Sequence, residues 1–106
     1  MPKYLVTASY TAEGAKGVLK DGGSKRKSVA EAAVKSAGGR LEAFYFALGA
    51  DDAFIIVDAP DHATVVATSL AINSTGAVKT KTTVLLTPEE VDQATKKQIS
   101  YKAPGT

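Results

Sequence analysis

The feature that most constrains this chain is the segment EAFYFALGADDAFIIVDAPD, residues 42–61, which is apolar at almost every position. Two parts of this region, residues 40–48 and 52–58, are rich in aromatic and β-branched residues and predict a β-hairpin. An antiparallel sheet with one face in water normally alternates apolar and polar residues, and this hairpin barely does. We therefore expect both faces of the hairpin to be covered.

A tight turn at Ala50 and Asp51 would assign the apolar side chains to two faces. One face would carry the opposed pairs Leu48–Ala53, Phe46–Ile55 and Phe44–Val57, and the other would carry Ala43, Tyr45, Ala47, Phe54 and Ile56. Helices can cover only one of these faces. Burying a large apolar side chain is worth ~1.5–3 kcal/mol, so the remaining patch favours association.

The expected cover for the second face is another copy of the chain, packed sheet to sheet about a two-fold axis. A homodimer, or a multiple of dimers, is therefore predicted. The alternative is that residues 87–106 fold back over the sheet of their own subunit. The sequence leaves open whether residues 98–106 stay on their own subunit or reach a neighbour.

Two further segments predict strands, and the first two helices lie between the first strand and the hairpin. The strands are KYLVTASY, residues 3–10, and AVKTKTTVLL, residues 77–86. Thr11 is expected to cap a short, glycine-interrupted helix that ends near Gly22 and Gly23. Ser24 is expected to cap a second helix, which has apolar residues at three-to-four spacing and which the Gly38–Gly39 pair stops.

A third helix should begin after the Asp61 cap and close at Gly76. A terminal helix is predicted over residues 87–97, because Thr87 can cap it, Pro88 follows at the first helical position and acidic residues occupy the first turn. The resulting order is the split βαβ pattern of a ferredoxin-like α+β sandwich, βαββαβ, with an extra C-terminal helix. We expect one domain, residues 1–106, with a four-stranded antiparallel sheet and the first helices on one face.

Composition excludes several classes of function. The chain has no cysteine and one histidine, so no metal site and no cofactor is expected. A formal net charge of +2 is too balanced for a nucleic-acid-binding protein. No apolar run approaches the ~20 residues of a membrane helix, so no membrane partner is expected. The N-terminus lacks the apolar core of a signal peptide, which predicts a cytoplasmic location.

Three stretches together resemble a known family. They are PKYLVTASYTAEGAKGVLKDGG, GGRLEAFYFALGADDAFIIVDAPD and STGAVKTKTTVLLTPEEV, and they cover essentially the whole chain. They resemble the GYD-domain family of small bacterial proteins. The resemblance implies a ferredoxin-like fold of the dimeric α+β barrel type and a bacterial source. It implies no particular activity.

The chain departs from the signature for which that family is named. A Gly-Tyr-Asp signature, usually with one residue between the Gly and the Tyr, is expected at the hairpin. Here the stretch is Gly49-Ala50-Asp51-Asp52, so that Asp51 replaces the Tyr. Gly and Asp favour tight turns, and we interpret the stretch as a turn. Any function that used the Tyr is in doubt in this chain.

The residues predicted to line a cavity between two sheets are Tyr10, Tyr45, Phe54, Ile56 and Lys81. In this interpretation the tyrosines and Lys81 give a mostly apolar pocket a few polar groups, as in many small-molecule sites. The alternative is that Lys81 protects an edge strand from unwanted pairing. His62 is a weak acid–base candidate, and a solvated position at the start of a helix is the simpler interpretation. The basic segment GGSKRKS, residues 22–28, is expected to be a solvated turn rather than a phosphate site.

These observations favour a homodimeric module that binds a small apolar ligand in a cavity between its sheets. One alternative is a cofactor-free enzyme of the dimeric α+β barrel type, similar to monooxygenases or isomerases, although that analogy rests on fold alone. Another is a purely structural assembly protein whose sheets meet without a cavity. An enzyme needs a positioned acid or base with a tuned pKa, whereas a binding protein needs only shape.

Overall fold

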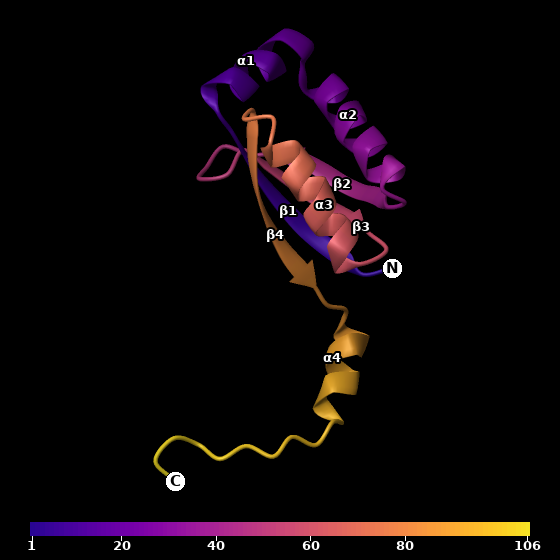
Figure 1. Ribbon diagram of the computed structural model, residues 1–106, viewed down its shortest axis with the longest axis vertical. Helices are drawn as coiled ribbons and strands as arrows, with labels where there is room; N and C mark the ends of the chain where they lie inside the picture. The colour runs from indigo at the N-terminus through magenta and orange to yellow at the C-terminus, as the bar shows by residue number, and fades with distance from the viewer.

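The computed structural model describes all 106 residues, as four strands and four helices (Figure 1). The elements in chain order are β1 (Lys3–Tyr10), α1 (Ala12–Asp21), α2 (Gly23–Ser36), β2 (Arg40–Phe46), β3 (Ala53–Asp58), α3 (His62–Asn73), β4 (Val78–Leu85) and α4 (Pro88–Thr95). The predicted elements are all present. The segment between β1 and β2 forms two helices in succession, as the glycine pair at its middle suggested.

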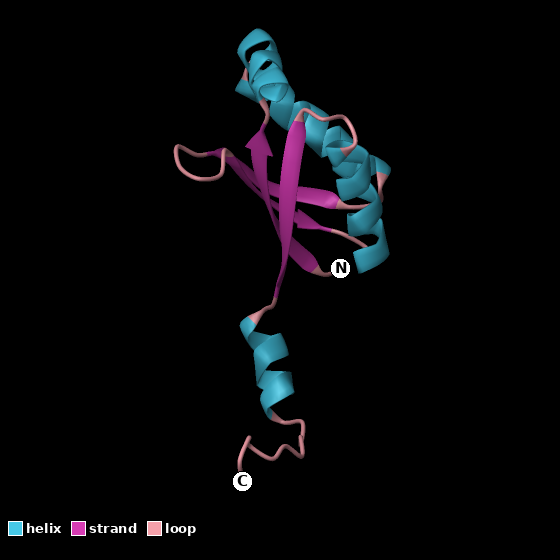
Figure 2. Cartoon of the chain, turned by 60° about the vertical axis from the view of Figure 1, so that its left-hand side comes forward, coloured by secondary structure: helices cyan, strands magenta, loops and turns pink.

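The four strands form one antiparallel sheet in the order β2-β3-β1-β4. This order is that of the ferredoxin-like α+β sandwich, so the predicted ferredoxin-like architecture is confirmed, whereas the dimeric α+β barrel type stays a prediction. Helices α2 and α3 lie on the same side of the sheet, and the opposite side has no helix over it (Figure 2). Strands β2 and β4 are the two edges.

The predicted hairpin register is wrong by two residues. Phe46 pairs with Ala53 and Phe44 pairs with Ile55. The two strands are joined by a loop over residues 47–52, closed by the Ala47 N–H, which donates to the Asp52 carbonyl at 2.8 Å. The tight turn at Ala50 and Asp51 therefore does not form. Because side chains alternate with a period of two, a shift of two leaves each strand residue on its predicted face.

A β-bulge at Glu42 interrupts the pairing of β2 with β3. Arg40 pairs with Asp58 and Leu41 with Val57, but the next partner of β3, Ile56, pairs with Ala43. Glu42 is left without a partner, which reverses the alternation of side chains along β2 at that point.

Side-chain caps begin three of the helices as predicted. The side chains of Thr11, Asp61 and Thr87 accept hydrogen bonds from backbone N–H groups in the first turns of α1, α3 and α4. Thr87 and Glu90 form a complete capping box. The predicted cap of α2 is wrong: Gly22, with φ of 84°, occupies the N-cap position, and α2 begins at Gly23 without a side-chain cap.

The alternation of β1 divides the sheet into two faces. Tyr4, Val6, Ala8 and Tyr10 face α2 and α3, and their cross-strand partners on β3 and β4 share that side. The core is small, since only nine of the 106 residues are buried. It consists of two clusters, one around Tyr4 and Val57 and one around Ala8, Ala53 and Val78.

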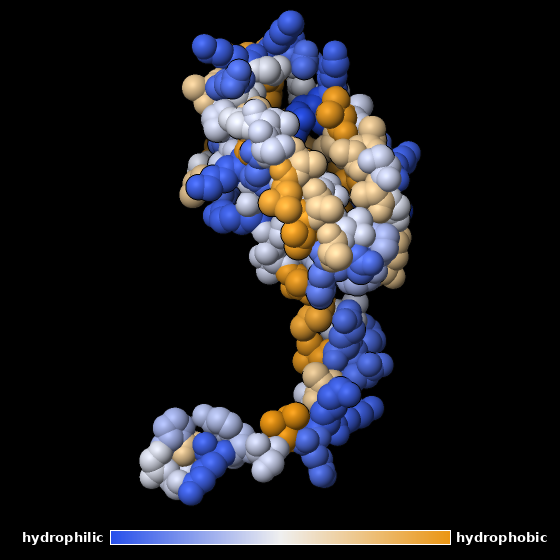
Figure 3. Space-filling view, viewed as in Figure 1, coloured by the Kyte–Doolittle hydropathy of each residue, from blue (hydrophilic) through white to orange (hydrophobic).

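The C-terminal segment, residues 86–106, extends away from the domain (Figures 1 and 2). The radius of gyration of the whole chain is therefore large, at 17.1 Å against about 13 Å for a compact chain of this length. Val91 on α4 and Leu86 before it are exposed, and apolar residues continue from the domain onto this segment (Figure 3). The alternative in which residues 87–106 fold back over the sheet is therefore not the arrangement seen. No helix has both the length and the apolar composition needed to cross a bilayer.

The start of α1 is held tightly against the turn before β4. The Thr11 hydroxyl donates to the Gly76 carbonyl oxygen at 2.9 Å, and the Thr11 N–H donates to the Ala77 carbonyl oxygen at 3.1 Å. Gly14 is buried in the same contact, and a Cβ added there would lie 2.0 Å from that oxygen. Gly17, one turn later in the same helix, has open space around it.

The same substitution at these two glycines should therefore have opposite effects. Gly14→Ala is expected to lower the free energy of unfolding by roughly 1–3 kcal/mol, because α1 must move away from Ala77. Gly17→Ala is expected to raise it by roughly 0.5–1 kcal/mol through helix propensity. Urea unfolding followed by circular dichroism measures both. Equal effects of the two substitutions would show that α1 is not clamped to this turn.

Candidate functional site

Four of the five predicted cavity residues lie on the face of the sheet that no helix covers, here called the open face. Tyr45 pairs with Phe54, Phe54 with Thr7, and Thr7 with Lys81, so their side chains form one row across the four strands. Ile56 lies in the adjacent row. Tyr45 is 71% exposed and Phe54 38% exposed, so this face has an uncovered apolar centre.

The fifth predicted residue, Tyr10, lies on the opposite face of the sheet. It occupies the last position of β1 on the helix-covered side and pairs with Val78. The guanidinium carbon of Arg26, on α2, lies 5.9 Å from the centre of the Tyr10 ring. Tyr10 therefore cannot share a cavity with Tyr45 and Lys81 within one subunit.

Charged residues lie at one end of the open face around Asp58. The Lys3 ammonium lies 2.8 Å from a carboxylate oxygen of Asp58 and 2.8 Å from one of Glu42. Arg40 donates to the other oxygen of Asp58 at 2.9 Å. The hydrogen bond from Lys3, with a smaller contribution from Arg40, lowers the pKa of the Asp58 carboxyl against the opposing effect of burial. The same contacts raise the pKa of the Lys3 ammonium.

The other end of the open face is closed by the loop that carries the Gly49–Asp52 stretch. Asp51 accepts a hydrogen bond from the Ser9 hydroxyl at 3.3 Å and pairs with Lys81 at 3.3 Å. Asp52 accepts a hydrogen bond from the Tyr10 backbone N–H at 2.8 Å. Both carboxylates are thus engaged in fixing the loop to the end of β1. The stretch is thus part of a structural connection, although this connection is the residue 47–52 loop and not the tight turn that was expected.

His62 lies away from both of these regions, at the first position of α3. Its Nδ1 is hydrogen-bonded to the hydroxyl of Tyr4 at 2.5 Å, and the two rings meet edge to face. Tyr4 is 1% exposed, so the histidine has a fixed and buried partner. In the basic segment of residues 22–28, the Lys25 ammonium lies 3.8 Å from a carboxylate oxygen of Asp21 one turn earlier.

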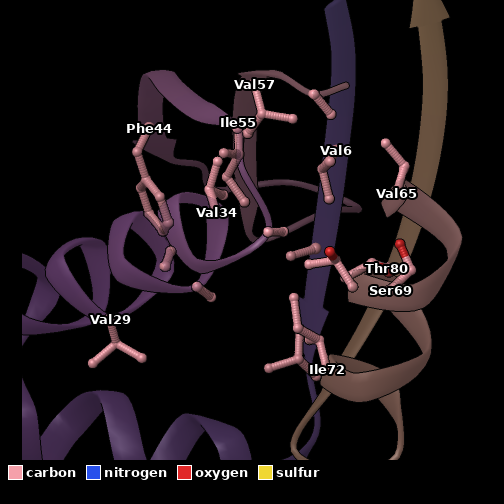
Figure 4. Close-up of a pocket in the computed structure, with 18 of the residues that line it drawn as sticks. Val6, Val29, Val34, Phe44, Ile55, Val57, Val65, Ser69, Ile72 and Thr80 are labelled. Carbon is pink, nitrogen blue, oxygen red and sulfur yellow. The ribbon is translucent and has the colours of Figure 1, made fainter. Parts of the chain in front are cut away.

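A pocket that the sequence did not predict lies between α2, α3 and the sheet, here called the α2–α3 pocket (Figure 4). Its volume is about 140 Å³, and 15 of its 21 lining residues are hydrophobic. Val6 and Ile55 form its floor, Val29 and Val34 line it from α2, and Ile72 lines it from α3 (Figure 4). The side of the pocket formed by α2 and its C-cap has mainly small side chains, which leave space in the pocket, namely Ala30, Ala33 and Ala37.

Arg26 and Tyr10 are the only ionisable residues that line this pocket. Arg26 forms no ion pair within 4.0 Å, unlike Arg40. Its Nε atom is buried and has no hydrogen-bond partner. A signal for this arrangement is present in the sequence, because Arg26 precedes Ala30 by four residues and so continues the apolar stripe of α2.

The topology and these two apolar surfaces define a small α+β protein of the ferredoxin-like class. The chain belongs to the GYD domain family, whose model matches residues 4–95. Neither a curated protein nor a solved structure matched the chain. Family membership names no ligand or reaction, so the function has to be argued from the site.

The charged cluster around Asp58 predicts how stability depends on pH. Because the folded-state pKa of Asp58 lies below its ordinary value of 3.8, the cluster stabilises the fold fully above that value. This contribution should be lost as the pH falls through 3.8 to the lower folded-state pKa. Urea unfolding of the wild type and of Asp58→Asn at a series of pH values measures the effect.

The Asp58→Asn variant should lose less stability on acidification than the wild type. Some dependence should remain, because the hydrogen bonds within the α3 cap also lower the pKa of Asp61. Parallel pH profiles for the wild type and the variant would show that ionisation of Asp58 contributes nothing to the stability of the fold.

Proposed function

We propose that this protein is a homodimeric small-ligand-binding module in which each subunit holds its ligand in the α2–α3 pocket. The observation that carries the proposal is an apolar hollow of about 140 Å³ that the chain's own side chains leave unfilled. Protein interiors are normally packed as densely as organic crystals, so such a space loses contact energy unless something occupies it. A cavity between two sheets, which the sequence suggested, stays a prediction.

The dimensions of the pocket fit a small apolar ligand. A cavity of about 150 Å³ lined by aliphatic and aromatic residues is large enough to hold benzene. The α2–α3 pocket has a comparable volume and a comparable lining, including Phe44, Ile55 and Ile72. The matching ligand is a single aromatic ring or a short branched alkyl group.

The lining favours binding over catalysis. An acid–base enzyme needs a side chain that gains or loses a proton at the reacting group. The pocket is lined by no carboxylate, histidine or lysine, and His62 is engaged with Tyr4 outside it. Arg26 offers a fixed fork of N–H donors and no acceptor, so it suits recognition rather than proton transfer.

The open face supports the dimer. Its apolar centre consists of Leu5, Ala43, Tyr45, Phe54 and Ile56, with charged groups at both ends. An apolar centre with a polar rim is the usual anatomy of a protein interface. Two copies packed through this face would give the dimeric α+β barrel arrangement, with the ligand pockets on the outer sides of the paired sheets.

Toluene titrations followed by ¹⁵N–¹H correlation NMR test the pocket. Toluene should shift amide resonances of residues in β1, α2 and α3 around the pocket. Ala33→Leu should weaken toluene binding at least about tenfold, because the larger side chain fills part of the space. Ala32→Leu is the matched control, since Ala32 is exposed on the same helix and lines no part of the pocket. Equal weakening by both variants, or no shifts in the wild type, would overturn the proposed ligand site.

Sedimentation velocity at micromolar concentration tests the dimer. The wild type should sediment as a dimer, and Phe54→Asp should sediment as a monomer because a charge would be buried at the centre of the interface. Leu48→Asp is the control, since Leu48 is fully exposed in the loop between β2 and β3. A monomeric wild type would overturn the face-to-face dimer.

A further inference from the structure

The α2–α3 pocket is apolar along its length but has a cationic end. Arg26 is in the first turn of α2 and lies over Tyr10 at the last position of β1, whereas Ala37 and Gly39 mark the opposite end. Arg26 is the only charged residue of the lining. A ligand that fills the pocket would therefore contact mainly aliphatic side chains along its length and a guanidinium at one end.

The guanidinium lacks the partner that such a group normally has. A buried N–H without an acceptor costs free energy, and buried arginines in proteins are usually paired with carboxylates or phosphates. Arg26 has a buried Nε without a hydrogen bond and no acidic side chain within 4.0 Å. The Tyr10 ring lies against the guanidinium at cation–π distance, and Nε is the guanidinium nitrogen that is both buried and without an acceptor. The Tyr10 hydroxyl likewise makes no hydrogen bond within the chain.

The local field at this end of the pocket also favours a negative charge. Helix α2 has Gly22 at its N-cap position, no side-chain cap and no acidic residue in its first turn. No capping side chain accepts a hydrogen bond from its N-terminal backbone N–H groups, unlike those of α3 and α4, and these groups lie at the positive end of the helix dipole. Of the two neighbours of Arg26 in the sequence, Lys27 adds positive charge, whereas Lys25 is paired with Asp21 at 3.8 Å.

We infer that the ligand of the α2–α3 pocket is a small apolar carboxylate, whose apolar group occupies the pocket and whose carboxylate binds the Arg26 guanidinium. This inference rests on the proposed function and specifies the chemical class of its ligand. A carboxylate matches the planar donor fork of an arginine. The pocket volume limits the apolar part to about the size of one aromatic ring.

The test compares benzoate with benzamide, which has nearly the same shape but no charge. Both should bind the wild type at the α2–α3 pocket by ¹⁵N–¹H correlation NMR, and benzoate should bind at least about tenfold more tightly. Arg26→Met should remove this preference and leave benzamide binding unchanged, because methionine keeps the apolar part of the side chain. Lys27→Met is the matched control, since it makes the same change of charge one residue away on the exposed side of α2.

The possible results separate this inference from the proposed function. If benzamide and toluene bind the pocket and benzoate has no advantage, the anionic ligand is overturned and the small-ligand module stands. If Lys27→Met reduces benzoate binding as much as Arg26→Met, a diffuse positive field replaces the Arg26 site and the inference is wrong. If none of the three probes binds, both proposals fail.

Discussion

The rest of the structure depends on β1, which is hydrogen-bonded to β3 along one edge and to β4 along the other. Its alternate side chains face opposite sides of the sheet. Val6, Ala8 and Tyr10 form part of the floor of the α2–α3 pocket, whereas Leu5 and Thr7 lie on the open face. The candidate ligand site and the candidate dimer surface are therefore back to back, separated by the thickness of one strand. A substitution in β1 that bends the strand affects both.

The unfilled pocket follows from how the two covering helices are anchored. Helix α2 packs against β2, and α3 packs against β4, at the two edges of the sheet. Side chains long enough to bridge the space over β1 and β3 are missing, because the inward positions of α2 are mainly alanines and those of α3 include Thr68 and Ser69. Asn73 holds α3 in place, since its side chain accepts a hydrogen bond from the Thr80 N–H and donates to the Thr80 hydroxyl. The helices thus cover the sheet without closing on one another.

Local patterns predicted most of the fold, and long-range geometry accounts for what they missed. The caps at Thr11, Asp61 and Thr87 depend on residues within one turn, so the sequence identifies them directly. The hairpin register depends on how the residue 47–52 loop docks on β1 through Asp51 and Asp52, which no local rule contains. The pocket depends on the spacing of two helices that are distant in sequence. The separation of Tyr10 from Tyr45 follows from strand alternation, but only once the register is known.

The bulge at Glu42 has a consequence for how β2 tolerates changes in length. Leu41 and Phe44 both face the helices although three positions separate them, because Glu42 occupies a place in the chain but none in the ladder. Glu42 shifts the alternation of side chains by one residue, so odd-numbered residues face the helices before it and the open face after it. Deletion of this one residue would restore a single phase along β2. Leu41 and Phe44 would still face the helices and Ala43 the open face, because their partners Val57, Ile56 and Ile55 follow one another directly on β3. Position 42 is therefore where β2 can lose one residue without turning side chains from one face to the other.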